Sequence, residues 1–399
     1  EVEGLDTLDN TKNQNILDSF QAKGEIKIDK IPNQSSDIWQ IDILNNYICN
    51  FHCVYCYSAK GRSNKQIEWM KVKALIDYLF APGRDLTRPY QINFSGGGEP
   101  LMSYDLIKQT VLYIEQINQK AHYPYNLGIV TNGSLIRPDI IDFFTEHQVD
   151  MAVSFEIFKD LQNAERGSYD RVVENIDYML ERGYSFGIRT TLTPLSVYRM
   201  KAMVEEVATR FPKLKTMVFD VVLDPSLFAQ PCELETYYDA FLQGFYEAKS
   251  IARQFGIRLE SNAVELLGIF RDRYCLGKIV LTPEGSLSVC ARVSSPKESQ
   301  YSRYTYGKVE NGKVNIDEDK LQSILTQNNI YTLPACDSCF AKWNCGGGCQ
   351  LFNEKFNPEY QHVRCEFVRK ALRYQLWNIL LNRDSGGKLV ENVKACLKQ

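Results

Sequence analysis

The strongest constraint on the fold is a regular alternation of strand-like and helix-like segments along the first two thirds of the chain. Between the short apolar runs, apolar residues recur at helical spacing, as in 67–79, 106–117 and 172–180. Consecutive βα units form a parallel sheet with right-handed crossovers. Six units are too few for a closed eight-stranded barrel. We therefore predict an α/β fold, an open partial (β/α)6 TIM barrel with its chemistry at the C-terminal ends of the strands. The expected strands are 39–44, 91–95, 125–131, 150–155, 185–192 and 216–223.

The rest of the chain has a different organisation. Residues 1–36 are polar and end in a loop-forming PNQSS segment, so we expect a lead-in before a barrel at 37–225. Residues 226–270 are expected to form a linker and a helix over 234–255. Residues 271–370 hold seven cysteines and a glycine triplet, which predicts a loop-rich domain organised by metal. A C-terminal helix, centred on 368–381, and a polar tail are expected over 371–399.

Charge and hydropathy exclude several classes of protein. The formal net charge is −3, which gives no indication of nucleic acid or an anionic membrane as partner. No apolar run approaches the roughly 20 residues that a membrane-spanning helix needs. Residues 1–15 do not have the pattern of a signal peptide, so we expect a cytoplasmic protein.

Cysteine is the unusual component, with 12 residues in the chain. Disulfide scaffolds are typical of small secreted domains, which this chain does not resemble. The cysteine spacing favours metal binding over disulfides or unrelated buried thiols.

The first cysteine cluster is a C-x3-C-x2-C triplet directly after the first expected strand, made of Cys49, Cys53 and Cys56. A cubane [4Fe–4S] cluster has four irons and usually takes four thiolates, so three ligands on one loop leave one iron open. The alternative is a zinc loop with a distant fourth ligand, although zinc sites usually show paired C-x2-C spacings.

The triplet and its surroundings resemble the radical S-adenosylmethionine (SAM) enzymes. In that family an aromatic residue commonly precedes the last cysteine, here Tyr55, and a "GGE" element binds the SAM ammonium group, here Gly97, Gly98 and Glu99. Glycine permits close approach of the backbone to a ligand, and a carboxylate can accept a charge-assisted hydrogen bond from an ammonium. The resemblance implies that the triplet holds the catalytic cluster, which cleaves SAM to a carbon radical.

Further strand ends are similar to SAM-binding positions of the same family. Thr131 and Asn132 begin a "TNG" sequence that the family places near the ribose. Ser154 matches only part of a Ser-x-Asp-Gly element and is a candidate ribose contact. Arg189 lies on the fifth expected strand, where relatives often present an arginine to the SAM carboxylate.

The later cysteines resemble the seven-cysteine SPASM pattern, the C-terminal domain of peptide-modifying radical SAM enzymes. The resemblance implies two auxiliary [4Fe–4S] clusters, hence three in all. The nearer cluster would be held by Cys275, Cys290 and Cys349, and the farther cluster by the remaining four cysteines. A zinc ribbon is the alternative interpretation of this pattern. Cys232 and Cys396 are left over, and Cys232 could be an eighth ligand. The farther set is Cys336, Cys339, Cys345 and Cys365.

The resemblance implies an oxidoreductase that acts on a peptide or protein. We expect a maturase that abstracts a hydrogen atom from a ribosomally synthesised precursor peptide and forms a thioether or carbon–carbon crosslink. Sulfatase-maturating enzymes, the second hypothesis, typically place an Asp after the cysteine that matches Cys290, whereas Ala291 and Arg292 follow here. A non-catalytic zinc-binding scaffold is the third.

Expected partners are the precursor peptide and an electron donor such as flavodoxin or ferredoxin. Many such maturases carry an N-terminal leader-binding domain of roughly 80 residues, for which residues 1–36 are too short. We therefore expect the leader to be recognised by another surface or by a separate leader-binding protein.

Overall fold

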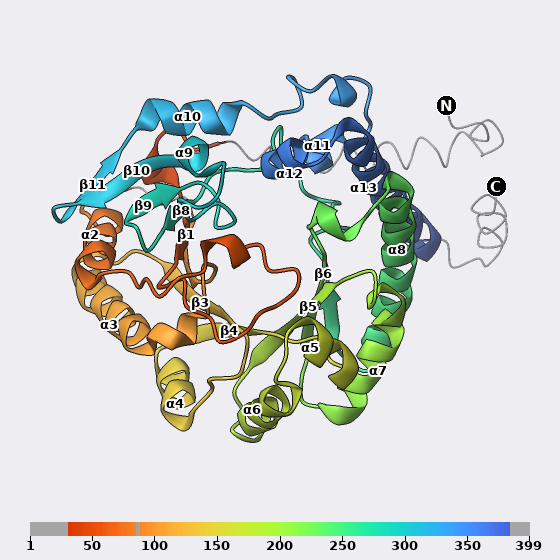
Figure 1. The fold of residues 1–399 in the computed structure, drawn as a ribbon, viewed down its shortest axis with the longest axis horizontal. Coiled ribbons are helices and arrows are strands. Elements are labelled where there is room, and N and C mark those ends of the chain that lie inside the picture. Colours follow the sequence, from red (N-terminus) through yellow and green to blue (C-terminus); the bar gives the residue numbers. More distant parts are fainter. Residues whose placement is uncertain (1–30, 85, 87, 384–399) are drawn as a thin grey trace.

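The computed structural model describes residues 31–84, 86 and 88–383, and its largest element is a single mixed sheet of eleven strands (Figure 1). The strand order is β11-β10-β9-β8-β1-β2-β3-β4-β5-β6-β7. The strands are β1 Gln40–Ile43, β2 Tyr90–Phe94, β3 Tyr125–Thr131, β4 Val149–Ser154, β5 Phe186–Leu192, β6 Thr216–Val221, β7 Arg258–Glu260, β8 Ile279–Leu281, β9 Ser286–Ser288, β10 Thr305–Glu310 and β11 Lys313–Ile316.

The predicted parallel α/β sheet is confirmed. Strands β1 to β7 pair in sequence order and all pairs are parallel, so the six expected strands correspond to β1 to β6 with ends shifted by at most two residues. The prediction missed β7, which lies in the region expected to be a linker. Three residues are too few to show the period-two alternation of a strand.

Helices cover the outside of the curved sheet (Figure 1). The long α8 follows β6 as expected, while the C-terminal helix α13 begins ten residues earlier than the pattern at 368–381 indicated, and Cys365 lies on it. The helices are α2 Trp69–Leu79, α3 Tyr104–Ala121, α4 Pro138–Glu146, α5 Lys159–Glu165, α6 Tyr169–Glu181, α7 Met200–Arg210, α8 Pro231–Gln254, α9 Tyr301–Tyr304, α10 Glu318–Thr326, α11 Lys342–Cys345, α12 Gln350–Lys355 and α13 Pro358–Arg383. Short 3-10 turns η2 to η7 connect several of these elements.

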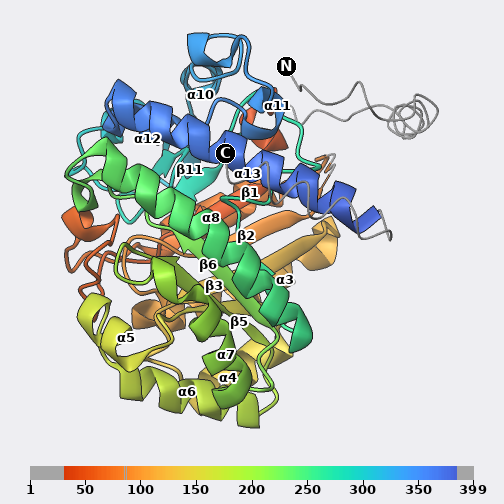
Figure 2. The same cartoon turned by 90° about the vertical axis from the view of Figure 1, so that its right-hand side faces the viewer.

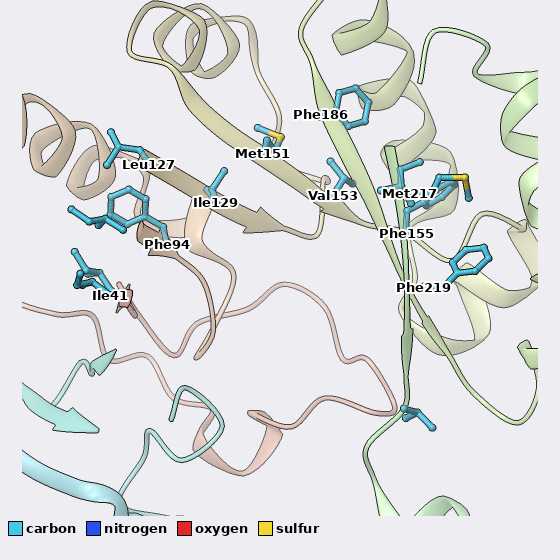
Figure 3. Close-up of a cluster of buried hydrophobic side chains, with 14 of the residues drawn as sticks. Ile41, Phe94, Leu127, Ile129, Met151, Val153, Phe155, Phe186, Met217 and Phe219 are labelled. Atoms are coloured by element: carbon cyan, nitrogen blue, oxygen red, sulfur yellow. The ribbon is translucent and has the colours of Figure 1, made fainter. Parts of the chain in front are cut away.

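Alternation along the barrel strands separates the core from the interior of the barrel. On β5, for example, buried and half-buried residues alternate over all seven positions. The buried set packs against the surrounding helices and includes Ile129, Val153 and Met217 (Figure 3). The half-buried set of the same strands faces the inside of the barrel, where polar side chains such as Ser154 and Arg189 lie in register.

The cysteine-rich region continues the barrel sheet. Strand β8 pairs in parallel with β1 on the side opposite β2, and β9, β10 and β11 follow as antiparallel neighbours. Helix α13 packs along α8, with the rings of Tyr238 and Phe367 stacked at 4.2 Å (Figure 2). The region expected as a second domain therefore shares one sheet and one hydrophobic core with the barrel.

In the described part of the chain, no helix combines the length and apolarity needed to cross a bilayer. The expected lead-in falls largely on residues 1–30 and the polar tail on 384–399, outside the described residues.

Candidate functional site

The C-x3-C-x2-C triplet lies on the long loop between β1 and α2, which runs across the mouth of the barrel (Figure 1). Cys49, Cys53 and Cys56 are all half-buried free thiols. A turn joins the last two, with the Cys56 amide donating to the Cys53 carbonyl at 3.1 Å. The Arg62 guanidinium donates to Cys56 Sγ at 3.2 Å. The loop thus presents three thiols beside one cation.

The glycines of the GGGE sequence allow close approach of the cysteine loop, rather than only of a ligand. The amides of Gly98 and Glu99 donate to the carbonyls of Asn46 and Ile48 at 2.9 and 2.7 Å. A Cβ atom at Gly98 would lie 2.0 Å from the Ile48 carbonyl oxygen, a distance that no side chain tolerates. Gly98 therefore ties the loop that follows β2 to the start of the cysteine loop.

The carboxylate of Glu99 joins three of the sequence-predicted residues. Its Oε1 accepts from the Thr131 hydroxyl at 2.6 Å and from the Leu101 amide at 3.1 Å, and its Oε2 accepts from the Asn132 amide at 2.8 Å. Burial raises the pKa of Glu99, and these three hydrogen bonds lower it. Asn132 also donates to the side chain of Asn50 in the cysteine loop at 2.9 Å. Glu99, Thr131 and Asn132 therefore lie together directly behind the triplet.

Tyr55 takes part in a buried network that the sequence did not indicate. Its hydroxyl donates to Glu156 Oε1 and accepts from Arg166 at 2.9 Å. Burial raises the pKa of Glu156 to about 7, opposed by Arg166 and by the Tyr55 hydroxyl. In addition, the amide of Val54 donates to the carbonyl of Glu165 at 3.0 Å. These contacts fasten the cysteine loop to β4 and α5.

The sequence contained a signal that could have identified Glu156 as a site residue, but none for Arg166. Glu156 stands two residues after Ser154, at the acidic position of the partly matched Ser-x-Asp-Gly element, so an acid is retained there. Arg166 follows α5 and no motif marks it. Its importance comes from burial against Glu156, with the two charged groups 3.8 Å apart.

Ser154 and Arg189 lie opposite each other on β4 and β5, inside the barrel. The guanidinium of Arg189 pairs with Asp220 on β6 at 2.5 Å, and both side chains are partly exposed. The two residues lie on the strands that follow β3, whose last residue Thr131 pairs with Val153 of β4. Their predicted contacts with SAM stay predictions.

Three of the later cysteines line one cavity. Cys275, Cys290 and Cys349 share it with Tyr304 and a set of mainly apolar side chains. Burial, and then the neighbouring thiols of Cys349 and Cys275, raise the pKa of Cys290 to about 12. The other lining residues are Val289, Ile324, Leu325, Asn328, Gly348, Gln350 and Leu351.

The remaining four cysteines form a second group. Burial, and then the thiols of Cys345, Cys339 and Cys365, raise the pKa of Cys336 to about 11. Between Cys345 and Cys349 the glycines at 346–348 all have positive φ, from 64° to 76°, a backbone that side chains rarely adopt. This left-handed segment turns the chain so that cysteines only four residues apart join different groups. The grouping is the one that the resemblance implies.

The two cysteine regions meet at Tyr57. Its ring lies 5.2 Å from the guanidinium of Arg292, two residues after Cys290. The hydroxyl of Tyr47 donates to the Ser294 carbonyl at 2.5 Å, and Lys297 donates to the carbonyl of Arg62 at 2.9 Å. The loop that carries Cys290 is therefore packed on the loop that carries the triplet.

Among the described residues, no three His, Cys, Asp or Glu side chains converge closely enough to hold one metal ion. That iron–sulfur clusters occupy the cysteine sites stays a prediction. A cubane distributes its ligands over four irons and so suits more widely separated thiols. Beside the triplet, Arg62 Nη1, Glu156 Oε2 and Arg166 Nε are buried with no hydrogen-bond partner in the described chain. Polar atoms of this kind are available to a bound polar group.

Of the two leftover cysteines, Cys232 is an exposed thiol in the first turn of α8. It does not line the cavity of Cys275, Cys290 and Cys349. Cys396 lies outside the described residues.

Comparison with known proteins finds a family model that matches part of the chain. The sequence profile of the Radical SAM superfamily matches residues 46–206, which contain the triplet, the GGGE sequence and Thr131. The chain is 19% identical over 363 residues to a cysteine-type anaerobic sulfatase-maturating enzyme of Clostridium novyi, covering 82% of this chain and 96% of that one.

Other relatives match over about a third of the chain. An uncharacterized protein of Methanocaldococcus jannaschii is 28% identical over 151 residues, 36% of this chain. The mycofactocin maturase MftC of Mycolicibacterium smegmatis is 26% identical over 148 residues, 35% of this chain. The match spans half the length of the archaeal protein and 33% of MftC.

Solved structures share the fold over most of the chain. The enzyme anSMEcpe with bound AdoMet has a TM-score of 0.66 at 16% identity, covering 86% of this chain and all of that one. Streptococcus suis SuiB, bound to its precursor peptide SuiA, has a TM-score of 0.60 at 13% identity and covers 88% and 86%. At these identities the likeness shows a common fold.

Proposed function

We propose that this chain, whose residues 46–206 match the Radical SAM superfamily, is a peptide maturase that crosslinks a ribosomally synthesised precursor. The supporting observation is the division of the seven later cysteines into two groups, with the loop of Cys290 packed on the loop of the SAM-site triplet. Such an arrangement suits a substrate oxidised between two redox centres. A peptide substrate is also supported by the structural neighbour SuiB, which was solved with its precursor peptide SuiA bound.

The triplet would hold a [4Fe–4S] cluster, and the two later groups would hold auxiliary clusters. With SAM bound and one electron added, a cluster at the triplet would supply the radical chemistry for abstraction of a hydrogen atom from the substrate. The chain's own residues then have three tasks. Arg62 stabilises the thiolate of Cys56. The network of Tyr55, Glu156 and Arg166 fixes the cysteine loop. Glu99 orders the segment of Thr131 and Asn132, where SAM is expected to bind.

Net oxidation follows from the electron balance of a crosslink. A substrate radical that couples with a thiol of the same peptide loses one proton and one electron, and a thioether bond forms. The proton goes to solvent or a nearby base. The electron would pass to a group held by Cys275, Cys290 and Cys349 and replace the one consumed in SAM cleavage, so that SAM is the net oxidant. The motif provides only three cysteines at the cavity that these residues line, so a fourth ligand position is open. In this proposal a thiolate of the substrate occupies it.

Formylglycine formation is the second candidate, and the alignment over 96% of a sulfatase-maturating enzyme favours it. Against it, Ala291 stands where that subclass typically has an aspartate. A Cβ atom placed on Gly96 would lie 3.5 Å from the Ala291 Cβ atom and 3.4 Å from the Tyr57 hydroxyl, so the three residues lie together. The described site therefore has no carboxylate at position 291 to accept a substrate proton.

The test uses the anaerobically reconstituted protein with SAM, a chemical reductant and one of two peptides. One is a candidate precursor peptide from a short reading frame that neighbours the gene, and the other is a sulfatase-type peptide with a single cysteine. Mass spectrometry should show loss of two hydrogen atoms from the precursor, with a new crosslink in its fragmentation pattern. Conversion of the sulfatase-type cysteine to an aldehyde would support the second candidate, and no 5′-deoxyadenosine with either peptide would contradict both.

A further inference from the structure

An apolar groove opens at the mouth of the barrel, between the segments that follow β5 and β6. Its volume is about 270 Å³, and none of the described cysteines lines it. Because parallel strands end at one edge of a sheet, both segments lie at the same edge as the cysteine loop that follows β1. The first turn of α8 and that loop lie on the same side of the molecule (Figure 2). We call this cavity the rim groove and define it by five of its lining residues, Pro194, Tyr198, Phe228, Thr236 and Tyr237.

The floor of the rim groove is made of two buried aromatic side chains. The ring centroids of Phe228 and Tyr237 lie 5.2 Å apart. The Tyr237 hydroxyl donates to the Leu192 carbonyl at 2.6 Å and accepts from the Val222 amide at 2.9 Å. Its polar end is therefore satisfied within the protein, and what the floor offers to a ligand is apolar surface.

Two apolar side chains stand exposed beside the groove. Leu195 and Tyr198 are each 70% exposed, the highest value among the large apolar side chains that the structure describes. Leu195 directly follows Pro194, so both belong to the segment that lines the groove. A single exposed apolar residue is normal on a protein surface, but two of them beside an open apolar cavity are typical of a binding site.

The groove segment is joined to the cysteine loop through the buried Glu165. The Thr193 hydroxyl donates to Glu165 Oε1, and the Glu165 carbonyl accepts from the Val54 amide at 3.0 Å. Val54 stands between Cys53 and Cys56 and is 59% exposed. Since only Glu165 separates the two segments, the groove lies within reach of a few residues of an extended peptide that has a residue at the triplet.

Two carboxylates beside the groove form no ion pair within the described part of the chain. Glu233 lines the groove and accepts from the Ala229 amide at 2.8 Å. Asp224 accepts from the Ser226 hydroxyl at 2.7 Å, and its carbonyl accepts from the amide of Leu227, another lining residue.

The cations of the neighbouring segments are already paired. They are Arg189 with Asp220, Arg199 with Asp160, and Lys201 with Glu205. Of these charged groups, only the carboxylates of Asp224 and Glu233 are left uncompensated. This negative charge complements a lysine or arginine of a ligand.

We propose that the rim groove binds a segment of the precursor peptide in which a large apolar side chain stands next to a lysine or arginine. The apolar side chain fills the groove over Phe228 and Tyr237, and the cation meets Asp224 or Glu233. The volume lies below the roughly 300–1,000 Å³ of a pocket for a whole drug-sized ligand, so it suits one or two side chains. The inference rests on the proposed function, which makes a peptide the substrate, and adds the residues that this peptide must carry.

The test measures binding of fluorescein-labelled peptides to the reconstituted protein by fluorescence anisotropy. The probe is a glycine–serine peptide with one Phe-Lys pair, and its two controls carry Ala-Lys or Phe-Glu instead. We expect the Ala-Lys peptide to bind about tenfold more weakly, because it buries no aromatic ring. The Phe-Glu peptide should bind about threefold more weakly, with a smaller difference at high salt.

Thr236→Trp should raise the Kd of the Phe-Lys probe about tenfold, because the new ring occupies the groove. The matched control is Thr209→Trp. Both threonines are exposed and donate to a carbonyl four residues earlier in a helix, but Thr209 lies in the last turn of α7, at the opposite edge of the sheet. Tyr198→Ala should raise the Kd about threefold. It replaces Thr236→Trp if melting temperature and iron content show that the latter does not fold.

Equal Kd values for the three peptides, or values within twofold of wild type for Thr236→Trp and Tyr198→Ala, would overturn the site. So would a wild-type dimer, measured by light scattering, that Thr236→Trp dissociates, since the groove would then join two copies of the chain. Crosslinking of the candidate precursor is scored separately by mass spectrometry. If it occurs while probe binding does not depend on the groove, the site is wrong and the proposed function stands. If the probe binds in the groove but no crosslink forms, the site stands and the proposed function fails.

Discussion

The two cysteine regions are built in opposite ways. The triplet of Cys49, Cys53 and Cys56 comes from one loop, and that loop is fastened by backbone hydrogen bonds to the segments after β2 and α5. The later cysteines are spread over residues 275–365 and come from loops, short helices and α13. The first region is therefore ordered by the polypeptide. The second brings distant segments together around six half-buried thiols and the exposed thiol of Cys275.

Because of this difference, we expect substitutions in the two regions to affect different properties, activity in one and stability in the other. Closing long loops costs conformational entropy, and a metal group that binds only the folded chain contributes its binding energy to folding. We expect the later cysteines to stabilise the fold when iron is bound, and the triplet to contribute mainly chemistry.

The largest effect is expected for Cys53→Ala. Reductant-dependent release of 5′-deoxyadenosine should fall to the level of a protein-free control, because the triplet then offers only two thiolates. The melting temperature should change by no more than about 2 °C, since the backbone contacts of the loop remain. Cleavage of SAM at the wild-type rate would show that this loop is not part of the SAM site. Cys49→Ala and Cys56→Ala should behave alike.

Cys349→Ala should show the reverse pattern. The protein should lose the iron of one auxiliary cluster, and its melting temperature should fall by roughly 4–8 °C or more, because two distant segments are no longer joined. Some 5′-deoxyadenosine should still form without crosslinked product. Unchanged iron content and stability would show that Cys349 is not a ligand.

Gly98→Ala tests whether the polypeptide alone orders the first loop. The new Cβ would meet the Ile48 carbonyl oxygen, so we expect a loss of about 3 kcal/mol in the free energy of unfolding. Gly187→Ala is the matched control, because the nearest atom to its Cβ would be 3.4 Å away. Chemical denaturation of both variants makes the comparison, and equal stability would contradict the tight contact.

Glu99→Gln should have a smaller effect. The amide keeps the shape of the side chain but loses the charge, and one of its two ends no longer accepts the hydrogen bond from Thr131 or Asn132. Loss of a charge-assisted hydrogen bond costs about 1.5–3 kcal/mol, so we expect a ten- to hundredfold weaker affinity for SAM with the cluster retained. Calorimetry with SAM measures this, and an unchanged affinity would exclude Glu99 from the site.

Cys232→Ala should have no measurable effect on iron content or product formation. Its thiol is exposed in the first turn of α8, away from the cavity of Cys275, Cys290 and Cys349. Loss of one cluster's iron in this variant would identify Cys232 as the fourth ligand. That result would contradict the open position that the proposed crosslinking uses.

Much of the site's composition could be read from the sequence. The spacing of the triplet, the GGGE sequence and Thr131 with Asn132 all follow strands whose apolar pattern is clear. Since parallel strands end at one edge of a sheet, these segments had to meet, and Glu99 does contact both Thr131 and Asn132.

The sequence alone therefore determined the parallel barrel, its strand order and the residues at its mouth, because local periodicity and handed connections specify them. Only the tertiary structure revealed that β8 extends the same sheet beside β1, that Tyr55 is held by Glu156 and Arg166, and that Pro194 and Tyr237 line one groove. These features depend on burial and on contacts between residues far apart in the chain. Such contacts leave no periodic signal, because a partner can lie at any sequence separation.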